Sequence, residues 1–262
     1  MDQKLNIIVM TQEDAFFIPH NIRKLMQAAN VVEIVGIDCK SSMKNKYYDY
    51  YQWFGLLQCM RMGLKTISRK VERIVDKVSG FKYLAGECSI EDVAKANQIP
   101  FLQISDSNDE AYIEHVKRLQ PDLIVSYSAP QIIKEELLSV PKHGIINVHG
   151  SLLPDYRGCL PSFWYLYNEE TVGGATVHYM SKKIDDGDII EQGTVDLSNC
   201  KSMFQVMKKT KKLGGNLMVK AVKNIANGTA VTRPNISSEG RYCTWPTKEE
   251  GKEFRKKGFR LY

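Results

Sequence analysis

Short apolar runs alternate with helical patterns along the first two thirds of the chain, and this alternation restricts the fold more than any other feature. Leu5–Met10 (LNIIVM), Asp122–Tyr127 (DLIVSY) and Gly144–His149 (GIINVH) are typical of strands buried in a parallel sheet. Helical patterns stand between them, as in chains whose parallel strands are joined by crossover helices. The sequence therefore predicts an α/β protein with a mainly parallel sheet flanked by helices.

The same patterns predict the remaining elements and the domain limits. We expect strands at 5–10, 31–37, 101–104, 122–127, 144–149, 175–180 and 189–197, and helices at 19–29, 90–97, 109–119, 131–138, 162–167 and 202–227. Residues 47–78 lack strand alternation and predict one or two basic amphipathic helices. We therefore expect a catalytic domain over 1–228, a helical insertion at about 41–80 and a C-terminal extension over 229–262.

Composition excludes several classes of protein. The 262 residues are 43% hydrophobic and 25% charged, which is ordinary for a globular chain. No apolar run reaches the ~18 residues of a membrane span, and the acidic start does not resemble a signal peptide, so we expect a cytoplasmic protein with no stable membrane insertion. Six scattered cysteines without a CxxC pair favour reduced thiols. The net charge of +6 favours anionic ligands.

The segment from Gly144 to Gly158 (GIINVHGSLLPDYRG) carries the first chemical signal. Asn147 and His149 are two residues apart on a predicted strand, so their side chains leave the same face near its carboxyl end. Open α/β sheets bind ligands at that edge. An amide donor beside an imidazole suits acyl transfer, because one group can stabilise an oxyanion and the other can move a proton. Alternatively, His149 simply caps the strand.

A second segment, Thr176 to Ile190 (TVHYMSKKIDDGDII), adds His178 and a turn that begins with Asp185. A carboxylate there could orient an imidazole and stabilise its charged form. The same turn could instead be only a turn or a cation-attracting loop. A metal-dependent hydrolase with His149, His178 and Asp185 as ligands is a rival interpretation, although it leaves Asn147 without a role.

Together these segments resemble the folate-dependent formyltransferases, which move a formyl group from 10-formyltetrahydrofolate to an amine. NVHGSLLPDYRG is followed, 38 residues after Asn147, by Asp185 in a T-x-H…I-D-x-G pattern, and the resemblance extends from about Pro121 to Gln192. It implies a Rossmann-like formyltransferase fold and catalysis without a metal or a covalent enzyme intermediate. It also implies three catalytic residues: Asn147 stabilises the oxyanion, His149 acts as acid and base, and Asp185, not Asp186, orients His149 and relays the proton.

The resemblance also implies binding residues. The folate would contact Gln131, Ile132, Lys183 and Ile184, largely through main-chain groups, and the substrate would contact Ser151, Leu153, Pro154 and Arg157. Gln131 and Ile132 could equally form the first turn of an ordinary helix after Pro130. Arg157 could pair with a substrate phosphate, or it could brace its loop against an acid. A nucleophilic thiol at Cys159 is a weaker idea, because the only base identified near it is His149.

Departures from well-known family members suggest the acceptor. No glycine-rich turn follows the first strand, which argues against a small ribonucleotide. Only 77 residues follow Asp185, fewer than the methionyl-tRNA type needs for its additional barrel. The chain resembles compact N-formyltransferases of dTDP- or UDP-linked amino-deoxy sugars, which serve O-antigen and lipopolysaccharide synthesis and are commonly homodimers. A methionyl-tRNA type or other small-amine enzyme, and a non-catalytic folate- or nucleotide-binding module, are the alternatives.

Two basic stretches have more than one interpretation. The segment Lys201–Lys223 contains seven lysines and no acid, which could attract tRNA, but a solvated helix face is the preferred reading, so no nucleic acid partner is expected. The inserted segment could lie on an anionic membrane surface. Its preferred interpretation is a helical layer that packs on the sheet or lines the substrate cleft.

Overall fold

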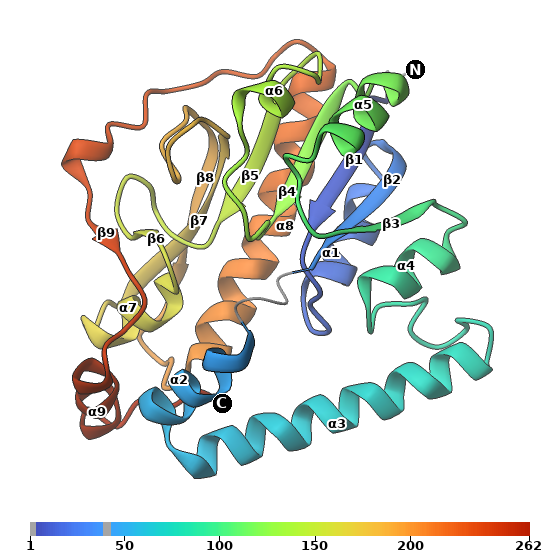
Figure 1. Ribbon diagram of the computed structural model, residues 1–262. Coiled ribbons are helices and arrows are strands. Elements are labelled where there is room, and N and C mark those ends of the chain that lie inside the picture. The colour runs from blue at the N-terminus through green and yellow to red at the C-terminus, as the bar shows by residue number, and fades with distance from the viewer. Residues whose placement is uncertain (1–3, 39–42) are drawn as a thin grey trace.

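A seven-stranded sheet forms the centre of the computed structural model, which describes residues 4–38 and 43–262 (Figure 1). Its strands are β1 (Asn6–Thr11), β2 (Asn30–Ile37), β3 (Phe101–Ile104), β4 (Leu123–Tyr127), β5 (Ile145–His149), β7 (Val172–Tyr179) and β8 (Ile189–Asp196), in the order β3-β2-β1-β4-β5-β7-β8. The first five are parallel, whereas β7 is antiparallel to β5 and to β8. The predicted α/β fold is confirmed.

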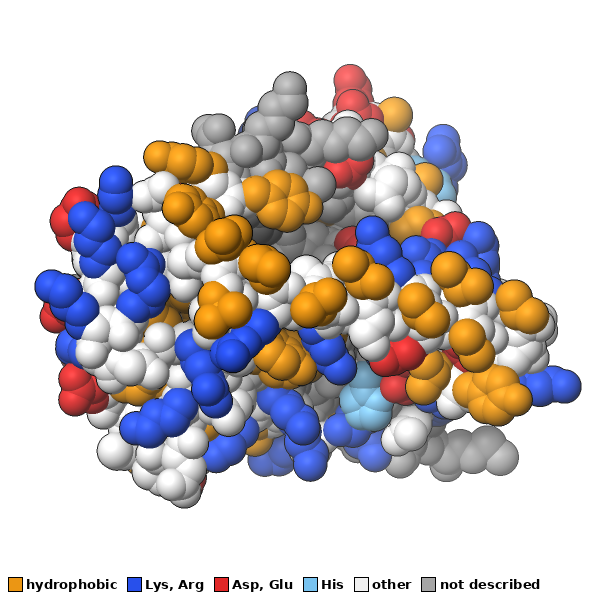
Figure 2. All heavy atoms as spheres, turned by 90° about the horizontal axis from the view of Figure 1, so that it is seen from below, with side chains coloured by type: hydrophobic (Ala, Val, Ile, Leu, Met, Phe, Trp, Pro, Cys, Tyr) orange, Lys and Arg blue, Asp and Glu red, His pale blue; other side chains and the backbone are white. Residues whose placement is uncertain are grey.

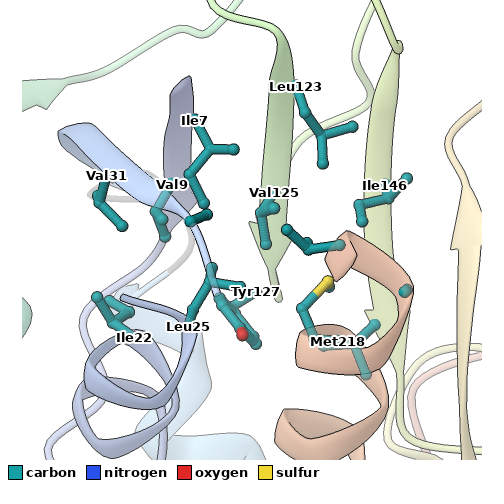
Figure 3. Packing of buried hydrophobic residues seen from close by; sticks show 14 of the residues in the cluster. Ile7, Val9, Ile22, Leu25, Val31, Leu123, Val125, Tyr127, Ile146 and Met218 are labelled. Atoms are coloured by element: carbon teal, nitrogen blue, oxygen red, sulfur yellow. The ribbon is translucent and has the colours of Figure 1, made fainter. Parts of the chain in front are cut away.

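Alternate residues of the strands pack against helices on the two faces of the sheet. Ile7 and Val9 of β1 join a cluster with α1 (Ile18–Leu25), α4 (Ile90–Ala96) and α8 (Met203–Ala226), part of which is drawn in Figure 3. Ile8 and Met10 point to the other face, toward α5 (Glu110–Leu119) and α6 (Glu135–Leu138). Each fully buried aliphatic side chain contributes about 1.5–3 kcal/mol, so both faces stabilise the sheet.

The expected helix at 131–138 is shorter than predicted, because only Glu135–Leu138 is helical. The Lys134 amide donates to Asn108 Oδ1 (2.7 Å), and the Gln131 side chain is bonded to the loop at 105–107. These long-range hydrogen bonds hold 131–134 as a loop, although Pro130 suits a helix start. The ends of the other elements lie within a few residues of the prediction.

Two helices, α2 (Met43–Phe54) and α3 (Leu56–Val78), fall within the segment expected to be inserted. They are separated by Gly55, whose φ of 78° lies in the left-handed region that glycine adopts without strain. Helix α3 has 23 residues and runs along the lower edge of the molecule (Figure 1). Among the described residues, no helix combines the length and apolar character needed to cross a bilayer.

The C-terminal residues pack onto the rest of the chain. Strand β9 (Tyr242–Cys243) pairs with β6 (Arg157–Gly158), and α9 (Lys248–Lys256) lies against α2 and α7 (Pro161–Tyr167). Phe254 is fully buried and stacks on Phe163, with ring centroids 4.5 Å apart. The tail thereby completes a third hydrophobic cluster. The division at residue 228 stays a prediction.

Candidate active site

The carboxyl end of β5 presents Asn147 and His149 on one face, as the two-residue spacing predicts. The neighbouring antiparallel strand β7 places His178 opposite Asn147. The amide Nδ2 of Asn147 lies 3.3 Å from Nε2 of His178. Sheet pairing alone therefore brings an amide and two imidazoles together.

Asp185 enters this group from the loop after β7. Its Oδ2 is 3.3 Å from Nδ1 of His149, and its Oδ1 is 3.6 Å from Nε2 of His178. The Gly158 amide of β6 donates to the same carboxylate (2.9 Å). Asp186 instead faces Arg157 at 3.8 Å. Asp185, and not its neighbour, is thus the carboxylate beside the imidazoles.

The surroundings of Asp185 keep it ionised. Burial alone would raise its pKa, but the His149 and His178 imidazoles and the Gly158 N–H outweigh that effect and hold the pKa of Asp185 well below its usual range. The backbone of Asp185 is left-handed, with φ of 49°, a conformation that aspartate tolerates better than most residues. The site therefore contains a fixed negative charge at neutral pH.

The two histidines have different hydrogen-bond partners. Both ring nitrogens of His149 face acceptors, since Nε2 lies 2.8 Å from the Tyr156 carbonyl oxygen and Nδ1 faces Asp185. Only a doubly protonated ring donates to both. Nδ1 of His178 lies 2.8 Å from the Tyr179 carbonyl oxygen, and its Nε2 lies near both Asn147 Nδ2 (3.3 Å) and Asp185 Oδ1 (3.6 Å). This pairing turns the Asn147 amide nitrogen inward and leaves its second N–H available.

The loop after β5 contains the four residues expected to contact substrate. Ser151 is fully buried and donates to the Asp155 carbonyl oxygen (2.7 Å), and Leu153, at 2% exposure, precedes a cis bond to the half-buried Pro154. Arg157 donates to the Ser237 carbonyl oxygen (3.1 Å) and faces Asp186, which is the bracing role considered for it. These contacts shape the loop. A substrate role for the four residues stays a prediction.

The two segments expected to hold the folate meet at an ion pair. Lys182 Nζ lies 3.3 Å from Glu135 Oε2, which joins the loop before Asp185 to the start of α6. Ile132 and Ile184 are exposed apolar side chains on these segments, at 57% and 41%. Exposed apolar groups beside loop main-chain groups fit a flat heteroaromatic ring with polar edges.

The two polar residues expected to contact the folate differ in their availability. The Gln131 side chain is occupied, because its Oε1 accepts from Ser107 N (2.8 Å) and its Nε2 donates to the Ser105 carbonyl oxygen (2.7 Å). Only main-chain groups of Gln131 could therefore reach a ligand without breaking these bonds. Lys183 is exposed, and its amide donates to Ser181 Oγ (3.3 Å). Folate binding by either residue stays a prediction.

Sequence reasoning missed three parts of this network. His178 was considered only as a metal ligand, although its place in the T-x-H pattern marked it, and its contact with Asn147 was not foreseen. The Gly158 amide and Asn235, whose Nδ2 donates to the Asp185 carbonyl oxygen (2.9 Å), carried no signal in the sequence. Gly187 shapes the turn, because a Cβ there would lie 2.0 Å from the Tyr179 carbonyl oxygen.

Two rival chemistries can be compared with this geometry. Burial, followed by the charge of Asp185, raises the pKa of the Cys159 thiol, which keeps it protonated and a poor nucleophile. Across residues 4–38 and 43–262, no three His, Cys, Asp or Glu side chains are grouped so that they could hold a metal ion.

Comparisons with known proteins identify the family of the chain. Residues 67–222 match the family model described as Formyl transferase. A methionyl-tRNA formyltransferase of Halalkalibacterium halodurans is 34% identical over 188 residues, which cover 71% of this chain and 59% of the relative. The chain thus spans less than two thirds of that relative's length.

Solved structures share the fold. A glycinamide ribonucleotide transformylase of Symbiobacterium toebii matches with a TM-score of 0.60 at 15% identity, covering 88% of this chain and 92% of that one. A sugar N-formyltransferase of Shewanella sp FDAARGOS_354 matches with a TM-score of 0.57 at 16% identity, covering 91% and 76%. Because the family model spans more than half of the sequence and includes Asn147, His149 and Asp185, the chain belongs to the formyl transferase family.

Proposed function

We propose that the protein transfers a formyl group from 10-formyltetrahydrofolate to the amine of a nucleotide-linked amino-deoxy sugar. The observation that carries the proposal is the grouping of Asn147, His149 and Asp185 at the carboxyl end of β5, within the segment matched to the family. Three residues from two distant parts of the sequence supply the donor, the imidazole and the carboxylate that amine attack on a formyl carbon requires.

The residues have separate tasks in this proposal. The bound folate supplies the formyl group, whose oxygen becomes negative as the amine attacks. The free N–H of Asn147 and the imidazolium of His149 stabilise that oxygen, and the loss of one such donor costs about 3 kcal/mol in activation free energy. No covalent enzyme intermediate is needed, which agrees with the raised pKa of Cys159.

His149 donates a proton to the folate nitrogen as the bond between that nitrogen and the formyl carbon breaks, and the neutral imidazole then accepts the proton that the acceptor amine loses. The low pKa of Asp185 disfavours a protonated carboxyl group, so Asp185 holds and orients the imidazolium, and a proton-relay role for Asp185 is the weaker part of the sequence-based expectation. To exchange a proton with substrate, His149 has to release its Nε2 contact with the Tyr156 carbonyl oxygen. The Tyr156 carbonyl oxygen is therefore the partner of His149 Nε2 only before the proton is exchanged.

A basic cavity supports an acceptor that carries phosphates. It has a volume of about 680 Å³, and its charged lining residues are all basic: Arg61, Lys65, Lys208 and Arg260. Phe204 and Tyr262 line it as well, with ring centroids 4.7 Å apart. Guanidinium and ammonium groups bind phosphate oxygens, and aromatic faces stack on bases, so the lining fits a nucleoside diphosphate.

Helix α8 connects this cavity with the edge of the sheet that carries the site. Lys211 lies three residues after Lys208, on the same side of the helix, and its Nζ donates to Ser128 Oγ (2.6 Å) just beyond β4. The strand order reverses between β1 and β4, and ligands of open α/β sheets bind at such a point. Helix α8 therefore contributes Lys208 to the cavity and Lys211 to a contact just beyond β4.

The turn after β1 argues against a small phosphorylated acceptor bound there. Asp14 Oδ1 accepts from the amides of Phe16 and Phe17 (both 2.7 Å) at the beginning of α1. An aspartate carboxylate thereby occupies the N–H groups that a phosphate would otherwise use. This supports the sequence-based argument against a small ribonucleotide.

Methionyl-tRNA is the second candidate acceptor, and the 34% identity to a methionyl-tRNA formyltransferase favours it. Purified protein with 10-formyltetrahydrofolate should be offered dTDP- and UDP-linked amino sugars and, separately, charged initiator tRNA, with mass spectrometry for the formamide. Formylation of an amino sugar supports our proposal. Formylation of the charged tRNA alone would contradict it and establish the second candidate.

A further inference from the structure

Helix α3 is attached to the molecule by its polar face. Arg69 donates to the carbonyl oxygens of Ala15 (2.6 Å) and Glu87 (2.5 Å), and Arg73 forms an ion pair with the buried Asp92. Asp76 is 1% exposed and accepts from backbone amides of the turn that follows the helix. In a helix on the surface of a monomer, side chains of this kind usually face the solvent.

The outward face of α3 is apolar along its whole length. Figure 2 shows a row of hydrophobic side chains that follows this helix, with basic side chains beside it. Seven of them are 54% to 85% exposed: Leu57, Met60, Leu64, Ile67, Val71, Ile74 and Val78. An apolar surface of this length, about 35 Å for 23 residues, marks an interaction site.

The spacing of these seven residues is strictly heptad. They follow one another at intervals of 3, 4, 3, 4, 3 and 4 residues, so they occupy alternate a and d positions with Leu57 at a. Two further exposed apolar side chains, Leu56 at g and Val75 at e, flank this row. A continuous row at a and d is the seam by which one helix packs against another, whereas a helix lying on lipid needs no such period. The occupant indicated by this spacing is a second helix.

We infer that this seam pairs with the α3 seam of a second copy of the chain, in antiparallel orientation about a twofold axis. The first half of the seam carries Leu and Met, and the second half carries Ile and Val. Antiparallel pairing therefore places one γ-branched or unbranched side chain against one β-branched side chain in every layer. The layers are Leu57 with Ile74, Met60 with Val71, and Leu64 with Ile67.

The charges beside the seam permit this pairing. Its e and g positions carry three bases, Arg61, Lys70 and Lys77, and no acid. In the antiparallel alignment, Arg61 lies opposite Ser68, and Lys70 lies opposite Gly63. Lys77 lies opposite the exposed Leu56. No two bases face each other, so the patch is self-complementary, as a twofold interface requires.

The seven residues of the sequence outside the described ranges contain only Met1 and Cys39 as apolar residues. They cannot supply a second row of seven apolar side chains. Arg61 and Leu64 also line the basic cavity, so the second copy would lie beside that cavity. The pairing involves none of the three proposed catalytic residues and does not depend on formyl transfer.

The test is the mass of the purified full chain by multi-angle light scattering, compared with Ile67→Glu/Ile74→Glu. Both positions are exposed, so the variant should keep its circular dichroism and thermal midpoint. We expect twice the 29.9 kDa of one chain for the wild type and 29.9 kDa for the variant. Val231→Glu, a matched change at an exposed valine outside α3, should leave the mass doubled.

A monomeric wild type overturns the inference, whether or not the protein sediments with vesicles containing phosphatidylserine. A variant that keeps the doubled mass overturns it as well, because another surface then holds the copies together.

The orientation of the two helices is tested by oxidising a mixture of Leu57→Cys and Ile74→Cys chains, with wild-type protein oxidised in the same way as the baseline. Crosslinks only in the mixture support antiparallel pairing, and crosslinks in Ile74→Cys alone overturn it.

Discussion

Asp185 determines the charge arrangement of the catalytic group. A single carboxylate contacts two imidazoles, and each imidazole has a different second partner. His149 lies between the Asp185 carboxylate and the Tyr156 carbonyl oxygen, whereas His178 lies between the Tyr179 carbonyl oxygen and the Asn147 amide. In the proposed mechanism, His149 moves the proton and His178 positions Asn147, so the two tasks belong to different histidines that contact the same carboxylate.

The first prediction concerns Asp185 and pH. Its folded-state pKa is depressed, so its contribution to stability is fully present above its unfolded pKa of about 3.9 and is lost as pH falls toward the folded value. We expect Asp185→Asn to lower the free energy of unfolding by a constant amount between about pH 5 and about pH 7, and by a smaller amount below about pH 4. Urea denaturation of the wild type and the variant across this pH range measures the difference in the free energy of unfolding.

The exposed Asp188→Asn is the control, because its side chain has no partner among the contacts found for the described residues. A difference between wild type and Asp185→Asn that grows as the pH falls would contradict the assignment of a depressed pKa.

The second prediction concerns His178. His178→Phe keeps a ring of similar size in this buried position but removes the acceptor for Asn147 Nδ2. One hydrogen bond contributes about 1 kcal/mol, so we expect kcat to fall roughly tenfold or less, with little change in KM for the folate. Asn147→Ala should cost more, about 10²–10³ in kcat, because it removes the donor itself. Equal losses would show that His178 does more than position Asn147.

The sequence allowed part of this site to be predicted. The two-residue period places Asn147 and His149 on one face without any structural information. The choice of Asp185 over Asp186 came from the family resemblance, because a turn pattern alone does not say which side chain points inward. The contact of Asn235 with Asp185 spans 50 residues and depends on how the tail folds back, so no local pattern could predict it.

At the scale of elements, the strands buried in the sheet were the most predictable, because short continuous apolar runs are typical of strands that are buried on both faces. The pairing of β6 with β9 was not predictable. Each strand has two residues, and their register is fixed by the close approach of Gly158 to the Cys243 carbonyl oxygen, 2.4 Å from where a Cβ would stand. The period of α3 was visible in the sequence, but which face points outward depends on Arg69, Arg73 and Asp76 finding partners on the body.

The third prediction concerns the end of α3. Asp76 accepts from the amides of Tyr83 (3.2 Å), Leu84 (2.7 Å) and Gly86 (2.8 Å), which fixes the turn after the helix. Asp76→Ala leaves buried donors without a partner, so we expect a loss of about 2–4 kcal/mol in the free energy of unfolding. Urea denaturation measures the loss, with the exposed Glu136→Ala as control. A change below about 0.5 kcal/mol, typical of surface positions, would contradict this role.

Over the whole molecule, the tail binds back onto the catalytic region. Asn235 holds the backbone of Asp185, and β9 pairs with the strand whose Gly158 amide donates to the Asp185 carboxylate. Farther along, Trp245 stacks on Trp53 of α2, with ring centroids 5.9 Å apart. The tail therefore links the helices outside the sheet with the loop that carries the carboxylate.

The fourth prediction tests this link. Phe254 is fully buried between α9 and α7, so Phe254→Ala should cost about 3–5 kcal/mol of folding stability. Because the same segment supports β9, any formyl transfer should weaken before global unfolding. Thermal unfolding and activity measured over the same temperature range provide the check. If activity is lost only at the temperature of global unfolding, the tail does not support the site in the way proposed.

The most direct test of the central claim is formyl transfer itself, measured as formamide formed per enzyme in a single turnover with 10-formyltetrahydrofolate and a nucleotide-linked amino sugar. We expect product with the wild type. We expect rates lower by about 10² or more for Asn147→Ala and His149→Asn, both with unchanged circular dichroism. A near-normal rate in folded His149→Asn would contradict the proposed formyl transfer through this group.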